Sequence, residues 1–137
     1  MKITVILCTY NRCLSLGRAL ASVSSSIVPK SVEWDVLVVD NNSHDQTRAV
    51  IEEYCRRYPD RFRYLFEAHP GKSYALNSAI READADVLAF MDDDVEVDPN
   101  WLCNLTAPLS NYELAGSSGR ILPDVAFTPP SWLGTSC

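Results

Sequence analysis

The stretch WDVLVVDNNSHD, residues 34–45, places an apolar run directly before a polar turn. Residues 34–39 are almost continuously apolar, which is typical of a strand that is covered on both faces of a parallel sheet. Asp40 ends the run, and the next five residues have the composition of a turn. The turn leads into apolar residues at helical spacing, which predict a helix that ends before Pro59.

The same order of strand, polar loop and helix recurs along the chain. Three further apolar runs are predicted strands: Ile3–Cys8, Phe62–Phe66 and Val87–Met91. Apolar residues of the first predicted helix share one face: Leu16, Leu20, Val23 and Ile27. This helix is expected to continue to Pro29, another helix is predicted to begin after Pro99, and Leu114–Leu122 is a predicted fifth strand. The alternation predicts an α/β fold with a mostly parallel sheet.

Composition limits the number of domains and the kinds of partner. The chain has 137 residues, 47% of them hydrophobic, which is enough for one ordinary globular core. Its formal net charge is −6, and no basic cluster is larger than the pair Arg56 and Arg57. Nucleic acid is therefore not an expected partner. An acidic protein can still bind a small polyphosphate when a divalent cation mediates the contact.

The compartment is inferred from targeting signals and cysteines. No apolar run approaches the roughly 18 residues of a membrane-spanning helix. The first residues, Met1–Leu7, lack the cleavage site of a secretory signal, so a cytoplasmic location is expected. Five cysteines, with no Cys-x-x-Cys spacing, are expected to be reduced thiols that pack as small hydrophobes: Cys8, Cys13, Cys55, Cys103 and Cys137.

Polar clusters follow the predicted strands, and these clusters are the candidate site. They are Thr9–Arg12, Asp40–Asp45, Gly71–Lys72 and Asp92–Asp94. In a parallel α/β sheet, the loops at the carboxyl ends of the strands converge, and ligands bind in the crevice between them. We therefore expect four separate loops to meet along one edge of the sheet.

The acidic triplet Asp92, Asp93 and Asp94 is the strongest single cluster. Three adjacent carboxylates repel one another unless a cation or hydrogen-bond donors compensate their charge. Oxygen ligands at a strand end suit Mg²⁺ or Mn²⁺, which would neutralise a diphosphate. The alternative is a solvated acidic turn before the next helix.

The remaining candidates each have an ordinary structural alternative. Asp40 can contact a ribose or base, or it can cap a turn. Lys72 can reach a phosphate, or it can be a surface lysine. His44 and His69 are interpreted as loop residues, because no partner carboxylate can be placed for either from the sequence.

Taken together, these clusters resemble the family 2 glycosyltransferases. Four segments carry the resemblance: ITVILCTYNR (3–12), VVDNNSHDQT (38–47), GKSYALN (71–77) and FMDDD (90–94). They are similar to the family's first strand and Thr-Tyr-Asn-Arg turn, its Val-Asp-Asp-Gly-Ser segment, its Gly-x-x-x-Ala-x-Asn segment and its Asp-x-Asp metal motif. Asn41 and Asn42 stand where the family has its second acidic residue and a glycine. The likeness covers about residues 2–122.

The resemblance implies a GT-A fold, a Rossmann-like three-layer sandwich, truncated after about the fifth strand. It implies a nucleotide-sugar-binding domain at residues 1–122. Residues 123–137 would be an irregular tail leading into an acceptor-binding part. The family places its general base later in the chain, and no acidic residue follows Asp124. The base is therefore expected beyond residue 137.

The resemblance also implies the roles of individual residues. Donor-binding residues would be Thr9, Tyr10, Arg12, Asp40, Lys72, Asp92 and Asp93. Asp94 and Asp92 would bind Mn²⁺ or Mg²⁺. The implied activity is metal-dependent, inverting transfer of a sugar from a nucleotide-diphosphate sugar, with UDP as the expected nucleotide, to a hydroxyl acceptor.

Three other functions remain open at this stage, and the chain could also form a homo-oligomer. The first is a module that binds the nucleotide sugar without transferring it. The second is a phospho-acceptor signalling domain, although such domains place the acidic pair before the lysine, whereas here the triplet follows Lys72. The third is a sugar nucleotidyltransferase, which needs a glycine-rich loop where this chain has Thr9–Arg12.

Overall fold

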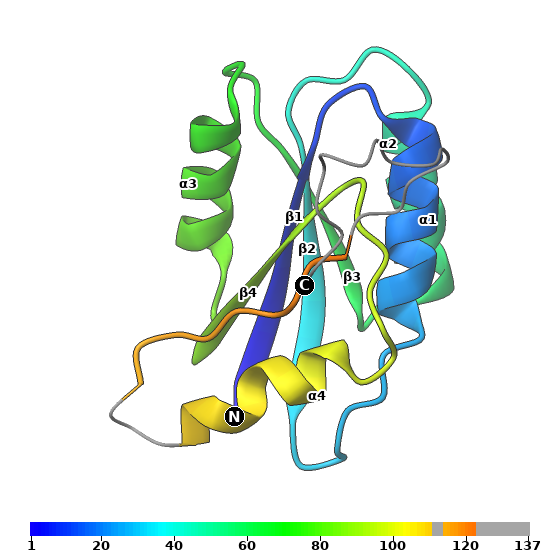
Figure 1. The fold of residues 1–137 in the computed structure, drawn as a ribbon. Coiled ribbons are helices and arrows are strands. Elements are labelled where there is room, and N and C mark those ends of the chain that lie inside the picture. Colours follow the sequence, from blue (N-terminus) through cyan, green and yellow to red (C-terminus); the bar gives the residue numbers. More distant parts are fainter. Residues whose placement is uncertain (111–113, 123–137) are drawn as a thin grey trace, which may run out of the picture.

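The strands form one parallel sheet (Figure 1). The computed structural model describes residues 1–110 and 114–122. The order across the four-stranded sheet is β3-β2-β1-β4, with these bounds: β1 Lys2–Thr9, β2 Glu33–Asp40, β3 Phe62–Phe66 and β4 Val87–Asp92. Thr9 pairs with Asp40 and Cys8 with Asp92, so three strands end at nearly the same level.

Helices cover both faces of this sheet, which makes three layers (Figure 1). The helices have these bounds: α1 Cys13–Ser24, α2 Thr47–Arg57, α3 Lys72–Glu82 and α4 Trp101–Thr106, followed by a 3-10 turn, Ala107–Ser110. Helices α1 and α2 lie on one face, and α3 lies on the other. No helix within the described ranges combines the length and hydropathy needed to cross a membrane.

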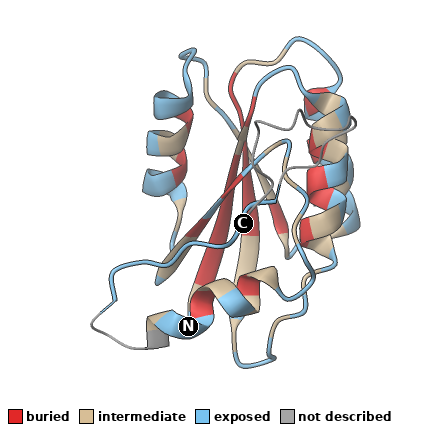
Figure 2. Ribbon diagram, viewed as in Figure 1, coloured by how far each residue is buried: buried red, intermediate tan, exposed pale blue. Residues whose placement is uncertain are grey.

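Alternation along β1 divides the core between the two faces of the sheet. Figure 2 shows the buried residues along the central strands and on the helix sides that face the sheet. Val5 and Leu7 point toward α1 and α2, whereas Ile6 points toward α3, and all three are almost fully buried. A central parallel strand loses water on both faces, which explains why its sequence is apolar throughout. On α3 the sheet-facing residues are small, Ala75 and Ala79.

Helix α1 is shorter than its apolar spacing predicts. The expected stripe of Leu16, Leu20 and Val23 is buried, but the helix ends at Ser24, and Ile27 is 63% exposed. Three serine hydroxyls near this end donate to carbonyl oxygens three residues earlier: Ser22 to Ala19, Ser24 to Ala21 and Ser25 to Ser22. Serine side chains that bond the local backbone compete with helix propagation, so the expected extension to Pro29 is wrong.

The predicted fifth strand is also wrong within the described residues. Residues 114–122 contain no strand, and each of them is exposed, including Ile121 at 82%. The centre of this segment is AGSSGR, which lacks the β-branched and aromatic residues that favour strands. Residues 1–110 and 114–122 therefore contain four strands, whereas the sequence predicted five. The expected irregular tail, residues 123–137, lies outside the described residues.

Candidate functional site

The carboxyl ends of β1, β2 and β4 and the start of α3 surround one open cleft of about 380 Å³. This strand-end cleft is lined by Cys8, Thr9, Tyr10, Arg12, Asn41, Lys72, Ala75, Asp92, Asp93 and Asp94. All the predicted site residues except Asp40 are among them. The loops converge because parallel strands end at the same edge of the sheet.

The end of β1 supplies the floor of the strand-end cleft. Thr9 is 3% exposed, and its hydroxyl oxygen has no hydrogen-bond partner among the described residues. Tyr10, the next residue, is 54% exposed. Asn11, at φ 50°, ties this turn to the loop after β2, because its side-chain oxygen accepts the His44 N–H at 2.7 Å. The exposed Tyr10 ring offers a ligand an aromatic contact, whereas the Thr9 hydroxyl oxygen is itself buried.

Two basic side chains compensate the acidic triplet. Lys72 Nζ lies 2.5 Å from Asp92 Oδ1, and Arg12 Nη1 lies 2.9 Å from Asp94 Oδ2. The hydrogen bond to Asp92 raises the pKa of Lys72 above its ordinary value. All four side chains are about half exposed, so each ion pair contributes little to folding, about 0–1 kcal/mol. The pairs instead keep opposite charges available at one edge of the cleft.

The expected metal site is only partly matched by this arrangement. Carboxylate oxygens are the donors that Mn²⁺ and Mg²⁺ prefer, so the residue types fit. However, no group of three or more acidic, histidine or cysteine side chains is gathered closely enough to hold an ion in the described part of the chain. Asp92 and Asp94 face Lys72 and Arg12 instead. Metal binding by these two residues stays a prediction.

Asp40 lies beside the strand-end cleft but does not line it. Its side chain is 1% exposed, and both carboxylate oxygens are used inside the protein. One oxygen accepts the Ser43 N–H at 2.9 Å, and the other lies 3.3 Å from the Tyr64 hydroxyl. This is the turn-capping role that the sequence left as the alternative. A contact between Asp40 and a ligand stays a prediction.

Cys8 and Asn41 line the strand-end cleft, although the sequence marks neither as a site residue. Burial raises the pKa of the Cys8 thiol to about 11, so the thiol is neutral near pH 7. A neutral thiol is a poor nucleophile, which agrees with the predicted packing role. The position of Asn41 directly after Asp40, within one of the polar clusters, was the available signal.

The two histidines lie outside the strand-end cleft. His69 and His44 are both exposed, and neither lines the strand-end cleft. The ring Nδ1 of His69 is 2.9 Å from Glu67, and the ring stacks on Tyr74. Hydrogen bonds from the Ser78 hydroxyl and from His69 lower the pKa of Glu67 to about 2. The structure thus supplies the carboxylate partner of His69 that sequence alone could not place.

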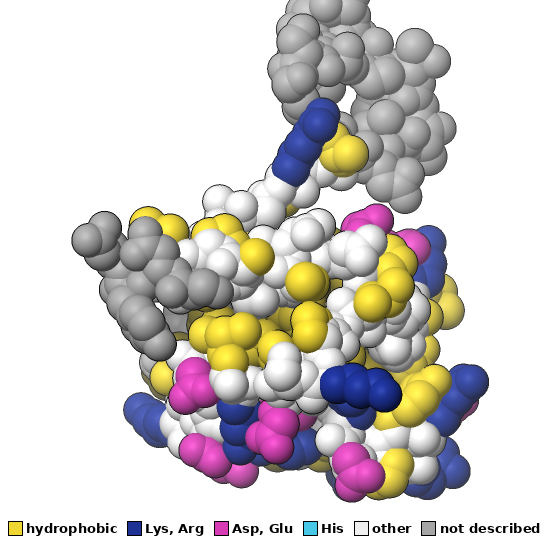
Figure 3. All heavy atoms as spheres, turned by 90° about the horizontal axis from the view of Figure 1, so that it is seen from below, with side chains coloured by type: hydrophobic (Ala, Val, Ile, Leu, Met, Phe, Trp, Pro, Cys, Tyr) yellow, Lys and Arg dark blue, Asp and Glu magenta, His cyan; other side chains and the backbone are white. Residues whose placement is uncertain are grey.

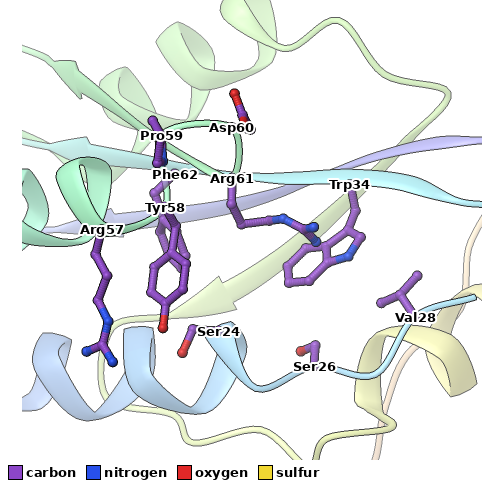
Figure 4. A pocket seen from close by; sticks show the side chains of 10 residues that line it. All are labelled: Ser24, Ser26, Val28, Trp34, Arg57, Tyr58, Pro59, Asp60, Arg61 and Phe62. Carbon is purple, nitrogen blue, oxygen red and sulfur yellow. The ribbon is translucent and has the colours of Figure 1, made fainter. Parts of the chain in front are cut away.

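A second cavity of about 530 Å³ lies where β2 and β3 begin, at the opposite end of the sheet (Figure 4). Aromatic rings and arginines line much of it, and the Arg61 guanidinium lies 3.9 Å from the centre of the Trp34 ring. Figure 3 views this amino end of the molecule, where hydrophobic side chains gather near the middle and charged ones lie mostly along one side. None of the predicted site residues lines this amino-end cavity.

Comparison with known proteins identifies the class of this fold and site. The model of the family described as glycosyl transferase family 2 matches residues 4–134. The chain therefore belongs to glycosyl transferase family 2. Its α/β fold with a parallel sheet is the GT-A fold, as the resemblance predicted.

Individual relatives agree with this assignment. The succinoglycan biosynthesis protein ExoM of Rhizobium meliloti is 29% identical over 133 residues, which are 97% of this chain and 43% of the relative. The glycosyltransferase AglE of Haloferax volcanii is 35% identical over 101 residues, 73% of this chain and 33% of the relative. The chain thus spans less than half the length of these relatives.

Solved structures show the same fold. Residues 1–349 of TarS of Staphylococcus aureus, in complex with UDP-GlcNAc, superpose with a TM-score of 0.69 at 28% identity, and the match covers 90% of this chain and 37% of that TarS chain. The mannosyltransferase PcManGT of Pyrobaculum calidifontis, in complex with GDP-Man and Mn²⁺, superposes with a TM-score of 0.63 at 29% identity. That match covers 69% of this chain and 28% of the mannosyltransferase.

Proposed function

We propose that this chain is the donor-binding half of a metal-dependent, inverting glycosyltransferase, and that the strand-end cleft holds a nucleotide-diphosphate sugar. One observation carries the proposal: Lys72 and Arg12 meet Asp92 and Asp94 where the strands end. A diphosphate with a divalent cation is a ligand that such an alternating set of charges can accept. UDP-sugar is the donor we favour, since the related TarS was solved with UDP-GlcNAc.

Each cleft residue has a role that its position supports. The Thr9 hydroxyl, which has no partner in the described part of the chain, can bond a polar atom of the nucleotide sugar, and the exposed Tyr10 ring can pack against a planar base. Lys72 and Arg12 can exchange their carboxylate partners for phosphate oxygens, which are also negatively charged acceptors. Binding and orienting the donor are the tasks we assign to these residues.

Asp94 and Asp92 are the residues we propose as metal ligands. A bound Mn²⁺ or Mg²⁺ supplies positive charge that stabilises the departing diphosphate. To reach the ion, both carboxylates must leave their ion pairs with Arg12 and Lys72, which are half exposed and therefore weak. This exchange leaves the two basic groups free to contact phosphate oxygens.

The test compares nucleotide binding with and without Mn²⁺ in the whole chain. We expect UDP to bind more tightly with Mn²⁺ than without it, as measured by isothermal titration calorimetry. Asp94→Ala should weaken binding about tenfold and remove the benefit of Mn²⁺, since a charged ligand is lost. Asp60→Ala, which removes an exposed carboxylate at the amino-end cavity, is the matched control and should bind like the parent chain.

Two results decide between the open functions. Unchanged nucleotide affinity and unchanged cation dependence in Asp94→Ala would exclude the proposed metal site. Release of UDP from a UDP-sugar in the presence of hydroxyl acceptors separates transfer from binding alone. We assign no general base to the described residues, and a positioned base contributes on the order of 100-fold to 10,000-fold to rate.

A further inference from the structure

The carboxamide of Asn41 lies between strand β2 and the segment Glu67–Gly71, here called the 67–71 loop. Its Nδ2 group donates to two carbonyl oxygens, that of Glu67 at 3.1 Å and that of His69 at 2.6 Å. Its Oδ1 atom accepts the Gly71 N–H at 2.8 Å. The residue is 6% exposed. One buried side chain therefore makes three hydrogen bonds to the backbone of a loop more than 25 residues away in sequence.

Asparagine is well suited to this position for a chemical reason. The contacts require two N–H donors on one side of the group and an acceptor on the other, which a carboxamide provides. An aspartate has the same shape but would turn a carboxylate oxygen toward the Glu67 and His69 carbonyls. That replacement exchanges two attractive contacts for two repulsive ones in a buried place. The motif of the family that the chain resembles has an acidic residue at this position, where this chain has Asn41.

The loop that Asn41 holds leads directly to Lys72. Gly71 has φ 129°, a backbone conformation that side chains rarely allow, and Lys72 is the first residue of α3. Asn41 is itself anchored, because its backbone N–H donates to the Thr9 carbonyl at 2.9 Å. A continuous series of hydrogen bonds thus connects the end of β1 to the first turn of α3.

We propose that Asn41 is a positioning residue, which holds the 67–71 loop and so sets where Lys72 stands in the strand-end cleft. The inference rests on the proposed function for its effect on nucleotide binding. Asn41 acts through Lys72, whose amino group lies 2.5 Å from Asp92. Releasing the loop allows the lysine to move away from the phosphate position without disturbing the sheet.

The first test uses Asn41→Asp and a matched control. We expect Asn41→Asp to weaken UDP binding in the presence of Mn²⁺ about tenfold, since the carbonyl groups of Glu67 and His69 lose their hydrogen-bond donors. Asn42→Asp adds the same charge to the same turn, at a side chain that makes no hydrogen bond to the described residues, and should change affinity less than twofold. Equal losses in the two variants would show an effect of charge alone and would overturn the proposal.

A double-mutant cycle tests whether the effect passes through Lys72. If it does, adding Asn41→Asp to Lys72→Ala should weaken binding less than twofold further, because the lysine is already gone. Fully additive losses would overturn the proposed coupling. Asn41→Ser, which is uncharged, should reproduce the coupling and guards against a variant that fails to fold.

The Gly71 amide provides a readout that needs no ligand. In the parent chain, hydrogen exchange measured by NMR should be slow at Gly71 and fast at Lys72 and Ser73, whose N–H groups have no described partner. Asn41→Ser should accelerate exchange at Gly71 and leave the amides of β1 protected. A parent chain that binds no UDP would exclude the proposed function, while exchange at Gly71 still decides whether Asn41 holds the loop.

Discussion

Thr9 and Thr4 both lie on β1, but their hydroxyl groups differ in hydrogen bonding. Both are buried, at 3% and 0% exposed. The Thr4 hydroxyl donates to Asp35 at 2.6 Å, whereas the Thr9 hydroxyl has no partner among the described residues, and Thr9 is one of the residues that line the strand-end cleft. A buried hydroxyl without a partner lowers stability, and such groups are often kept for a ligand.

We expect Thr9→Val to preserve or raise the free energy of unfolding, by up to about 1 kcal/mol. Valine has nearly the shape of threonine but lacks the hydroxyl that is left without a partner. The variant should weaken UDP binding several-fold. Thr4→Val is the control and should lower the free energy of unfolding by about 1–2 kcal/mol, since Asp35 loses a partner. Urea unfolding and calorimetry measure the two effects, and a Thr9→Val variant that unfolds more easily would contradict the interpretation.

Cys8 allows a chemical test of the strand-end cleft. Burial raises the pKa of this thiol to about 11, so its thiolate fraction at pH 8 is small. We expect Cys8 to react with iodoacetamide on the order of 100-fold more slowly than a free cysteine. Peptide mapping by mass spectrometry after timed alkylation measures the rate, and rapid labelling of Cys8 would contradict its assignment as a packed, neutral thiol.

Among the helices and strands, α3 is the one whose packing depends most on the residues at its start. Gly71 precedes this helix at φ 129°, and a Cβ added there would lie 3.4 Å from the Tyr74 ring. The helix then carries Lys72 at its first position and packs on the sheet through Ala75 and Ala79. The backbone of one glycine therefore influences both the packing of α3 and the place of the lysine.

Gly71→Ala should lower the free energy of unfolding by about 1–2 kcal/mol, because alanine tolerates this backbone conformation poorly. UDP binding should weaken at the same time. Gly17→Ala in the interior of α1 is the matched control, since a Cβ there meets nothing within 4 Å, and it should stabilise the chain by up to about 1 kcal/mol. Equal effects of the two variants in urea unfolding would contradict the role assigned to Gly71.

For the molecule as a whole, two hydrogen-bonded carboxylates, Asp45 and Glu67, should make stability depend on pH. Hydrogen bonding with the Thr47 side chain, together with the N–H groups of Thr47 and Cys13 that Asp45 accepts, lowers the pKa of Asp45 to about 2 from an ordinary 3.8. Glu67 has its pKa lowered to about 2 from an ordinary 4.5 by hydrogen bonds from Ser78 and His69. Because each folded pKa lies below the unfolded one, each carboxylate stabilises the fold above its unfolded pKa.

That stabilisation should be lost as the pH falls from about 4.5 to 2, when the carboxylates take up protons that favour the unfolded chain. The free energy of unfolding, measured in urea at pH 6 and at pH 3, should therefore fall. Glu67→Gln should reduce the fall, since glutamine does not titrate. A variant with the full pH dependence of the parent chain would show that Glu67 is not responsible.

The sequence by itself determined the order of elements and the residues that could meet. Continuous apolar strands and helical spacing are local patterns, so they predicted the four strands, the helices and the loops that now line the strand-end cleft. Predictions from local patterns were wrong at two places. They extended α1 to Ile27, and they predicted a strand at Leu114–Leu122. At both places the outcome depends on competing backbone bonds and on burial by neighbours, which spacing does not record.

Only the tertiary structure decided what each site residue touches. It turned Asp40 inward to cap a turn, paired Lys72 with Asp92 and Arg12 with Asp94, and placed Asn41 among the carbonyls of a distant loop. Except for the contact of Asp40 within its own turn, these contacts join residues that are 20 to 82 positions from each other in the sequence. Side-chain direction and hydrogen-bond partners arise from packing in three dimensions, whereas the sequence records only neighbours along the chain.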